Sequence, residues 1–445
     1  MSLTLKVVIG MGLGIVIGLF FNLSGLNVDG SFINTYIVEG IFHVIGKMFI
    51  NALKMLVVPL VFFSLICGVC GIGNLNTLGR VGAKSFALYM LTTAIAITVA
   101  MTIALTAGIG EGMNLAGTAS FTAKQAPPLT DVFINIIPSN PVRAMANGDM
   151  LPLIFFSILV GISMLMVGKK ATNFIESAEI ANEIMMKMVN IVMAAAPYAV
   201  FVLIAKSMAN LGTELLGQLV GYVLVLVGAL FIHLFITLML VLKFFSGLSP
   251  MMFLKKIRSA QVFAFSTASS NATIPVTLRA VTERMGVNNS VASFTVPFGA
   301  TINMDGTAIM QGVATVFIAN IYSAGLGTAE YVTVILMSVL ASIGTAGVPG
   351  VGLIMLSMVF AQVGLPIEGI GLILGVDRLM DMIRTAVNVS GDAVVSTIVA
   401  KSEGKFDLAV YSDASAGVVT NDDLLVDQLI EQELAAAVQN THDRS

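Results

Sequence analysis

The sequence is poor in charge, in tryptophan, in cysteine and in histidine. Charged residues make up 11% of its 445 positions, whereas a soluble domain carries about 25%. Hydrophobic residues make up 57% and occur in continuous runs rather than in the alternation of a membrane β-barrel. The net charge of −3 gives no indication of nucleic-acid binding. These features exclude an ordinary soluble domain and predict an all-α polytopic membrane protein.

The few cysteine and histidine residues do not suggest a redox or histidine-ligated metal centre. Cys67 and Cys70 form a CxxC pair inside the apolar run VVPLVFFSLICGVCGIG. We interpret them as small buried residues rather than as a redox pair. His43, His233 and His442 are widely separated in the sequence, so we expect no histidine ligand set. Because tryptophan is absent, interfacial anchoring is left to Tyr, Lys and Arg.

Apolar runs in the first 250 residues predict membrane-spanning helices, since roughly 20 residues cross the hydrocarbon layer. The expected spans are 5–24, 41–73, 84–109, 150–168, 180–208 and 214–243. The first run could be a signal peptide, but it is long and lacks an obvious small-residue cleavage site, so we interpret it as a span. The 22–40 connection contains no Lys or Arg, whereas later connections are basic. By the positive-inside rule this places the N-terminus in the cytoplasm.

After about residue 250 the pattern changes. Two apolar stretches are interrupted by small and polar residues, FAFSTASSNATIPVTL and VLASIGTAGVPGVGLIM. Each is followed by a span with polar residues inside it, first around NMDGT and then around DRLMDMIRTAVNVSGD. Interrupted segments at corresponding positions of two halves are typical of a transporter binding site. Irregular backbone at membrane depth must also be buried or line a cavity. We therefore expect both breaks to meet both polar helices at one site.

This change of pattern divides the chain into three parts. We predict six spanning helices in 1–250, a core of hairpin, polar helix, hairpin and polar helix in 251–401, and an acidic tail in 402–445. The stretch 111–149 is expected to be a polar, proline-containing loop. We interpret the tail as solvated and cytoplasmic, although DDLLVDQLIEQELAAAV could form a short amphipathic helix that binds a partner.

The last polar helix carries five ionisable side chains between apolar flanks. A charge in hydrocarbon costs roughly 3 kcal/mol or more, so it normally faces a protein interior or a water-filled cavity. Each residue of an α-helix is rotated by about 100° from the one before it. With this rotation, most of the polar groups fall on one face of the helix, which is about 100° wide. That face carries Asp377, Asp381, Arg384, Thr385, Asn388 and Asp392. We therefore predict that this helix forms the functional site.

Asp381 and Arg384 are three residues apart on this helix and could simply pair with each other. At an interrupted site they also suit a zwitterionic ligand, because a carboxylate binds an ammonium and the planar guanidinium binds a carboxylate through two hydrogen bonds. Helix N-termini and serine amides at the hairpin tips could hold a second carboxylate. A ligand with one amine and two carboxylates is an acidic amino acid.

The NMDGT motif suggests a cation site. Gly306 follows Asn303 and Asp305 inside a span, and glycine permits local unwinding of a helix. Unwound carbonyls together with a carboxylate and a carboxamide suit a small hard cation, which prefers oxygen ligands. The alternative is that Gly306 allows close helix packing beside a capped aspartate.

Residues from about 250 to 404 resemble the dicarboxylate/amino acid:cation symporters, a family that includes glutamate and neutral amino acid transporters. SSNATIPVTL, GATINMDGTA, ASIGTAGVPG and DRLMDMIRTAVNVSGD resemble its two hairpins and two polar helices in the same order. The resemblance implies a homotrimer with eight spanning helices, two re-entrant helical hairpins and inverted repeats. Helices one, two, four and five would form a scaffold. The other helices and both hairpins would form a transport domain that moves like an elevator, with the second hairpin as an extracellular gate.

The resemblance also implies roles for individual residues. Arg384 would bind the side-chain carboxylate of the substrate and Asp381 its amino group. The rest of the ligand shell would be Thr385, Asn388, Ser270, Thr307, Val348 and Gly352. A first sodium site would use Gly299, Asn303, Asn388 and Asp392. A second would use Thr301, Ser342, Ile343 and Thr345. A third would use Tyr89, Thr92, Thr93, Asn303 and Asp305, although the Tyr/Thr trio by itself looks like ordinary helix residues.

The sequence departs from the family pattern at two positions. Archaeal members carry an arginine just before the serines of the first hairpin, where this chain has Ala268. Several animal members carry an arginine just after the aspartate of the last helix, where this chain has Met382. The nearest arginine here is Arg378, one turn before Asp381.

From these patterns we predict a sodium-coupled importer of L-aspartate, L-glutamate or both, in a prokaryotic inner membrane, with no organic cofactor. Proton coupling, a C4-dicarboxylate substrate and a neutral amino acid substrate are the alternatives within the family. An intramembrane hydrolase would need a Ser–His, Asp–Asp or metal arrangement, and we expect no histidine near the site. A passive channel would not need an amine-binding aspartate beside an arginine. We therefore do not expect an enzyme.

Overall fold

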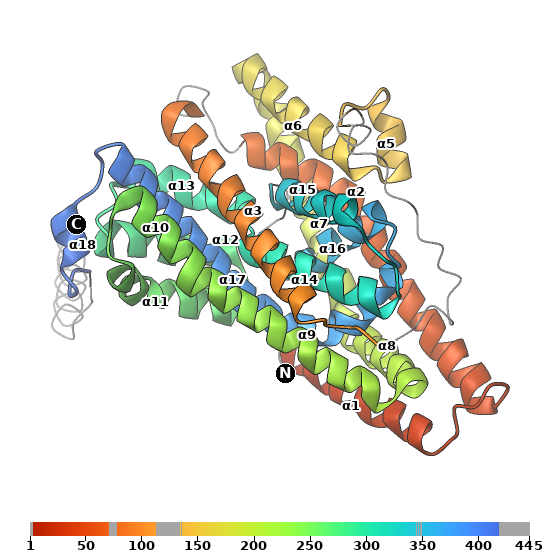
Figure 1. Ribbon diagram of the computed structural model, residues 1–445. Coiled ribbons are helices and arrows are strands. Elements are labelled where there is room, and N and C mark those ends of the chain that lie inside the picture. The colour runs from red at the N-terminus through yellow and green to blue at the C-terminus, as the bar shows by residue number, and fades with distance from the viewer. Residues whose placement is uncertain are drawn as a thin grey trace, which may run out of the picture.

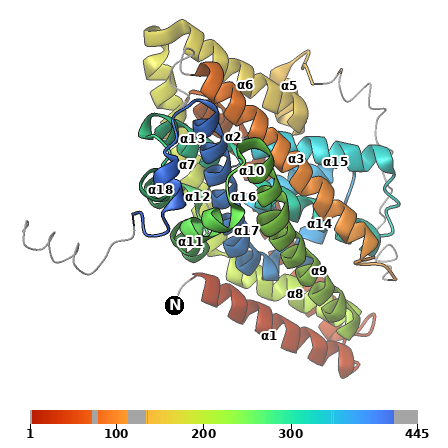
Figure 2. The ribbon, with the colours of Figure 1, turned by 60° about the vertical axis from the view of Figure 1, so that its left-hand side comes forward.

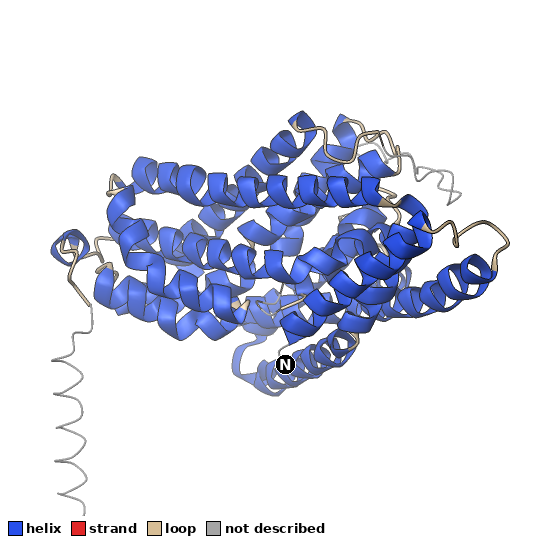
Figure 3. Cartoon of the chain, turned by 90° about the horizontal axis from the view of Figure 1, so that it is seen from below, coloured by secondary structure: helices blue, strands red, loops and turns tan. Residues whose placement is uncertain are grey.

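The computed structural model describes residues 3–70, 78–112, 134, 136–343, 345, 347 and 349–417. Over these residues every regular element is a helix (Figure 3). The β contact found there is an isolated antiparallel bridge between Val287 and Phe406. The prediction of an all-helical protein is confirmed.

The described residues among the first 250 form long helices together with several short ones. They are α1 (Leu3–Leu23), η1 (Ile33–Phe42), α2 (His43–Cys70), η2 (Leu78–Gly82), α3 (Ala83–Thr106), α5 (Pro141–Asn147), α6 (Met150–Val167), η4 (Gly168–Ala171), α7 (Thr172–Ala194), α8 (Ala196–Leu211), α9 (Thr213–Ile232), η5 (His233–Thr237) and α10 (Leu238–Ser246). The short helix α5 lies in the stretch that the sequence predicted as a loop, of which 113–133 and 135 lie outside the described residues.

The remaining residues form shorter helices and one very long one. They are α11 (Pro250–Thr267), α12 (Ser270–Arg279), η6 (Ala280–Arg284), α13 (Asn289–Ile302), α14 (Asp305–Ile321), α15 (Thr328–Ser342), α16 (Val351–Gln362), η7 (Ile367–Gly369), α17 (Ile370–Ser402) and α18 (Leu408–Ser412). The amphipathic stretch expected near the C-terminus lies outside the described residues.

Five helical stretches of the described chain are long and apolar enough to cross a membrane. They are Leu5–Leu23, Ile33–Cys70, Arg80–Thr106, Pro152–Ala194 and Thr213–Ser246. They agree with most of the expected spans, but two boundaries were wrong. The second span begins at Ile33 rather than near 41, and the predicted span 180–208 is divided between α7 and α8. The division falls at Ala195 because Pro197, in the first turn of α8, has no amide hydrogen to continue the helix.

Helix α1 packs against α8 along a row of glycines spaced four residues apart. A Cβ atom at Gly10, Gly14 or Gly18 would lie 2.5 to 2.8 Å from a backbone carbonyl oxygen of α8. Small residues at this spacing let two helix backbones approach closely, which is the usual basis of helix packing in a membrane. Away from this contact α1 is apolar and exposed, with Val16 at 65% and Phe20 at 59% exposure. An apolar face of this kind is suited to lipid.

Helices α14 and α17 lie at the centre of the bundle (Figures 1 and 2). α17 contacts α11, α13 and α14, and α14 also packs against α3 and α9. Nearly every described residue of α14 is buried, and α17 is buried on all faces from Val387 to Ala400. Most polar side chains of these two helices are therefore buried inside the bundle.

Candidate functional site

Two interrupted helix pairs meet at their tips. The chain leaves α11 at Ala268, which has a left-handed φ of 49°, and re-enters a helix after Ser269. The Ser269 hydroxyl donates to the carbonyl of Gly347 at 2.7 Å, and the Asn271 amide donates to the same oxygen at 3.1 Å. Gly347 belongs to the non-helical connection between α15 and α16. The two breaks found in the sequence thus lie against each other.

A third interruption separates α13 from α14 at Asn303 and Met304, which both have non-helical backbone angles. The sequence predicted local unwinding in the NMDGT motif, and the break lies at its first two residues, whereas Gly306 lies in the first turn of α14. A Cβ atom on Gly306 would lie 2.6 Å from the carbonyl oxygen of Arg384. The glycine therefore allows close packing of α14 on α17, which was the alternative interpretation. The Asn388 carboxamide fixes this contact by accepting from the Gly306 amide at 2.7 Å.

Arg384 is fully buried and lies between two carboxylates of its own helix. Its Nη1 is 2.8 Å from Asp377 Oδ1, and its Nη2 donates to Asp381 Oδ1 at 2.9 Å. The second oxygen of Asp381 accepts from the Gly350 amide at 3.3 Å and lies 3.9 Å from Arg378. A buried charge without a partner is strongly unfavourable, and these two aspartates stabilise the guanidinium. The two arginines and two aspartates together carry no formal net charge.

A small cavity of about 10 Å³ lies beside Asp381, between the two hairpin tips and the two polar helices. A cavity of this size holds about one water molecule. Most of the predicted substrate-binding residues surround it: Ser270, Thr307, Gly352, Asp381, Thr385 and Asn388. Arg384 lies next to them, with its Nη2 3.4 Å from where a Cβ of Gly352 would lie. Val348 lies outside the described residues.

The residues predicted for the first sodium site come together around Asn303 and Asp392. The Asn303 carboxamide nitrogen donates to Asp392 Oδ1 at 2.9 Å and to the Asn388 carbonyl at 3.3 Å. Gly299 is adjacent, because a Cβ there would lie 2.5 Å from Asp392 Oδ1. The Asn303 Oδ1 atom is buried without a hydrogen-bond partner. An unsatisfied oxygen beside a buried carboxylate is a suitable ligand pair for a hard cation.

The residues predicted for the third sodium site surround Asp305, which is fully buried. The Thr93 hydroxyl donates to Asp305 Oδ1 at 2.6 Å and the Thr92 hydroxyl at 3.4 Å. Tyr89 donates instead to the carbonyl of Thr295 at 2.9 Å, and its hydroxyl lies near Gly299 and Asp392. The Tyr/Thr trio of α3 thus lies between the two carboxylates.

The residues predicted for the second sodium site make mainly local contacts. The hydroxyls of Thr301, Ser342 and Thr345 donate to carbonyls of their own helical turns, at 2.9, 2.7 and 2.7 Å respectively. Ile343 is buried at the C-terminal end of α15. Of the described residues in this group, only Thr345 borders the cavity beside Asp381.

The prediction that no histidine lies near the site was wrong. His233, in η5 between α9 and α10, is buried, and its Nε2 atom lies 3.0 Å from Asp305 Oδ2. The only signal in the sequence was a single histidine inside an apolar span, which does not reveal what it faces. Asp377 was placed on the correct face of its helix, but its contact with Arg384 was not foreseen.

Long apolar helices surround a buried centre where helices are interrupted and where arginines and aspartates balance in charge. This combination is typical of a multi-pass membrane transporter. Residues 3–402 match the sodium:dicarboxylate symporter family. The chain is 32% identical over 414 residues to a proton/sodium-glutamate symport protein of Geobacillus stearothermophilus, covering 91% of this chain and 95% of that protein. It is 33% identical over 420 residues to a proton/glutamate-aspartate symporter of Escherichia coli (strain K12), covering 91% and 94%.

A C4-dicarboxylate transport protein of Bacillus subtilis (strain 168) is 30% identical over 425 residues, covering 94% of this chain and 97% of that protein. The chain therefore belongs to the sodium:dicarboxylate symporter family. It is a cation-coupled symporter rather than an enzyme. The relatives transport acidic amino acids or C4-dicarboxylates according to their names, and their names include both protons and sodium.

Proposed function

We propose that this protein imports L-aspartate and L-glutamate together with sodium ions. The observation that carries the proposal is the adjacency of buried Asp381 and Arg384 beneath two touching hairpin tips. An acidic amino acid has one ammonium and two carboxylates. Asp381 would bind the ammonium, Arg384 would bind the side-chain carboxylate, and the amides and hydroxyls of the tips would bind the α-carboxylate.

Asp381 supports an amino acid over a C4-dicarboxylate. A dicarboxylate has no ammonium, so its approach to Asp381 would bring like charges together in a low-dielectric site. Arg384 likewise supports an acidic over a neutral side chain, because a neutral ligand would leave the guanidinium without a carboxylate from the substrate. The presence of Asp381 beside Arg384 therefore fits the amino acid better than the dicarboxylate named for the Bacillus subtilis relative.

Charge balance supports coupling to cations. Arg378, Arg384 and the two aspartates that they contact together carry no formal net charge. An acidic amino acid therefore adds one negative charge to a buried site. A cation at the nearby oxygen cluster would compensate for it. Each ligand then raises the affinity for the other, which is the thermodynamic basis of symport.

Sodium is the coupling ion that the oxygen ligands suit best. The cluster of Asn303 and Asp392, with Gly299 and Asn388 beside it, offers carbonyl, carboxamide and carboxylate oxygens. The cluster around Asp305 offers a carboxylate with two threonine hydroxyls. We infer that these two clusters hold sodium. The second predicted site would require Thr301 and the α15 residues to rearrange.

The site supports an opening movement of the second hairpin. A cavity of about 10 Å³ is far smaller than an amino acid with nine non-hydrogen atoms. The connection around Gly347 and Gly350, between α15 and α16, covers it and contacts Asp381. We infer that this tip acts as the gate, within eight spanning helices and two re-entrant hairpins arranged as inverted repeats.

We further propose that the protein is a homotrimer with a moving transport domain and a fixed scaffold, in a prokaryotic inner membrane, with its N-terminus in the cytoplasm. In this proposal the helices around α14 and α17 form the transport domain, and the scaffold consists of α1, α2, α6, α7 and α8. The acidic tail would lie in the cytoplasm.

Proton coupling is the second candidate, because one relative is named as a proton/sodium-glutamate symport protein and another as a proton/glutamate-aspartate symporter. The contact of His233 with Asp305 favours it as well, since it places an imidazole nitrogen, which can carry a proton, beside a carboxylate of a predicted cation site.

The test is uptake of radiolabelled aspartate into proteoliposomes, with sodium and proton gradients imposed separately. We expect uptake with an inward sodium gradient alone, and competition by unlabelled glutamate but not by succinate. Uptake with a proton gradient in sodium-free buffer would favour the second candidate. Stronger competition by succinate than by glutamate would contradict the proposed substrate.

A further inference from the structure

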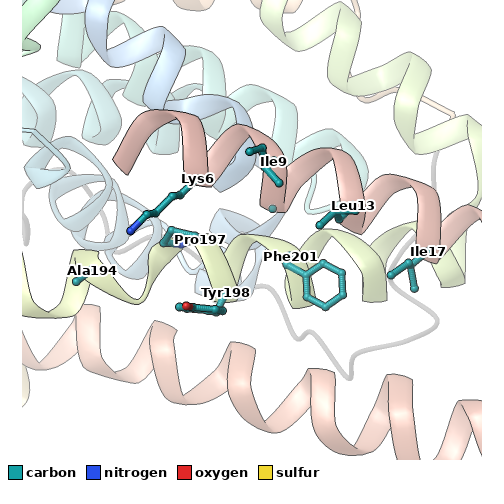
Figure 4. Close-up of a pocket in the computed structure, with 9 residues that line it drawn as sticks. Lys6, Ile9, Leu13, Ile17, Ala194, Pro197, Tyr198 and Phe201 are labelled. Atoms are coloured by element: carbon teal, nitrogen blue, oxygen red, sulfur yellow. The ribbon is translucent and has the colours of Figure 1, made fainter. Parts of the chain in front are cut away.

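An open groove of about 530 Å³ runs between α1 and α8 (Figure 4), and none of its lining residues borders the cavity beside Asp381. Its α1 wall is formed by Ile9, Leu13 and Ile17, and Lys6 lies at one end. Ile9 and Leu13 are 42% and 53% exposed, so the groove opens to the outside of the bundle. The side chains that line it are apolar except near Lys6.

The second wall comes from the other helix. Pro197, Tyr198 and Phe201 of α8 line it, and Tyr198 is 74% exposed (Figure 4). Gly10 forms part of the floor, where a Cβ atom would lie 2.5 Å from the Pro197 carbonyl oxygen. The close approach of the two backbones therefore leaves a narrow trough between the side chains on either side of the contact.

The length of this trough matches one leaflet of a bilayer. Eleven residues separate Lys6 from Ile17, which is a rise of about 17 Å along α1. Half of the hydrocarbon core is about 15 Å thick. α1 is also a candidate membrane span. If Lys6 lies at headgroup level, Ile17 lies near the middle of the membrane.

The trough is open along its length and its lining is almost entirely apolar. An apolar trough of one leaflet's length on a membrane-spanning helix is suited to an extended hydrocarbon chain. A lipid acyl chain is therefore the occupant that the lining and the length favour.

The two ends of the trough differ in charge. Lys6 is exposed at one end, and Tyr198 of α8 also lines the groove (Figure 4). Lysine and tyrosine at this level of a membrane helix interact with lipid headgroups, and a lysine favours anionic ones. We propose that this groove binds an anionic phospholipid, with one acyl chain along the trough and the headgroup phosphate on Lys6.

The test uses the full-length protein in lipid nanodiscs with a photoreactive acyl chain on either phosphatidylglycerol or phosphatidylcholine. Peptides that become labelled are mapped by mass spectrometry. Leu13→Trp fills the trough, and Lys6→Gln removes its charge. Val16→Trp is the matched control for the added ring, because Val16 is 65% exposed on α1 outside the groove. Lys170→Gln is the matched control for the lost charge.

We expect the wild-type protein to be labelled by phosphatidylglycerol on α1 and α8. One lysine near an anionic surface corresponds to about a fivefold preference, so Lys6→Gln should reduce phosphatidylglycerol labelling about fivefold, to the level of phosphatidylcholine. Leu13→Trp should abolish labelling of the groove by both lipids. Both control variants should resemble the wild type.

Equal labelling by the two lipids in the wild-type protein would overturn the proposal. So would groove labelling that survives Leu13→Trp. A change in oligomeric mass caused by Leu13→Trp, without a loss of lipid, would show that a second copy of the chain occupies the groove. If Leu13→Trp does not fold, the comparison of Lys6→Gln with Lys170→Gln decides the outcome by itself.

Discussion

The substitution Gly306→Ala tests whether close packing of α14 on α17 builds the site. The new Cβ would lie 2.6 Å from the carbonyl oxygen of Arg384 and 2.9 Å from its Cα. Ordinary contacts begin at 3.4 Å, so the two helices must separate by about 0.8 Å. Both obstructing atoms are backbone atoms and cannot rotate away. Overpacking of this kind costs about 1–3 kcal/mol, against a gain of up to about 1 kcal/mol in helix propensity.

We therefore expect Gly306→Ala to lower the thermal unfolding midpoint in detergent. A binding site tolerates misplacement of about 0.5 Å, and the required shift exceeds this tolerance. The affinity for aspartate, measured by calorimetry, should fall on the order of tenfold or more, which is about 1.4 kcal/mol.

Gly221→Ala is the matched control, because the same substitution on α9 meets no atom within 4 Å. It should leave affinity unchanged and leave stability unchanged or slightly higher. If Gly306→Ala behaves like this control, the close-packing interpretation of Gly306 is wrong.

Three further predictions concern charged groups. Arg384→Ala should abolish aspartate and glutamate uptake in proteoliposomes, because the buried guanidinium binds the side-chain carboxylate, and unchanged aspartate uptake would refute its role. Asp381→Asn should weaken aspartate binding at least tenfold, because the ammonium loses its charged partner. The same variant should bind succinate more tightly, measured by competition. If aspartate binding and succinate competition weaken in parallel, Asp381 does not bind the ammonium. Hydrogen bonds from Lys84 and Arg80 hold the pKa of the Glu403 carboxyl below its ordinary value of 4.5. A carboxyl whose pKa is lowered by folding stabilises the folded state above about pH 4.5. This stabilisation is lost as the pH falls through the pKa of the carboxyl in the folded state. Glu403→Gln should therefore lower the unfolding midpoint more at pH 7 than at pH 3, and an equal decrease at both values would refute the ion-pair explanation.

The helical class and the polar face of α17 could be predicted from the sequence because both follow from local periodicity. The spacing of Asp381, Arg384 and Asn388 places them on one side of any helix, and the structure adds the hairpin tips around them. Which carboxylate Arg384 faces depends on side-chain rotamers, so its contact with Asp377 could not be predicted from periodicity.

Features that depend on tertiary packing were mispredicted. The apolar run around His233 gave no indication that α9 and η5 turn this ring toward Asp305. The α13–α14 region is interrupted at Asn303 and Met304, whereas Gly306 packs closely against Arg384. The division between α7 and α8 did have a local signal in Pro197, because proline favours the first turn of a helix.

The central claim is that Asp381 and Arg384 bind an acidic amino acid in cooperation with sodium. Calorimetric titration of the purified protein with L-aspartate, at a series of sodium concentrations with ionic strength held constant by choline chloride, tests it most directly. We expect a heat of binding whose affinity rises steeply with sodium. Absence of binding at every sodium concentration, or an affinity independent of sodium, would contradict the account.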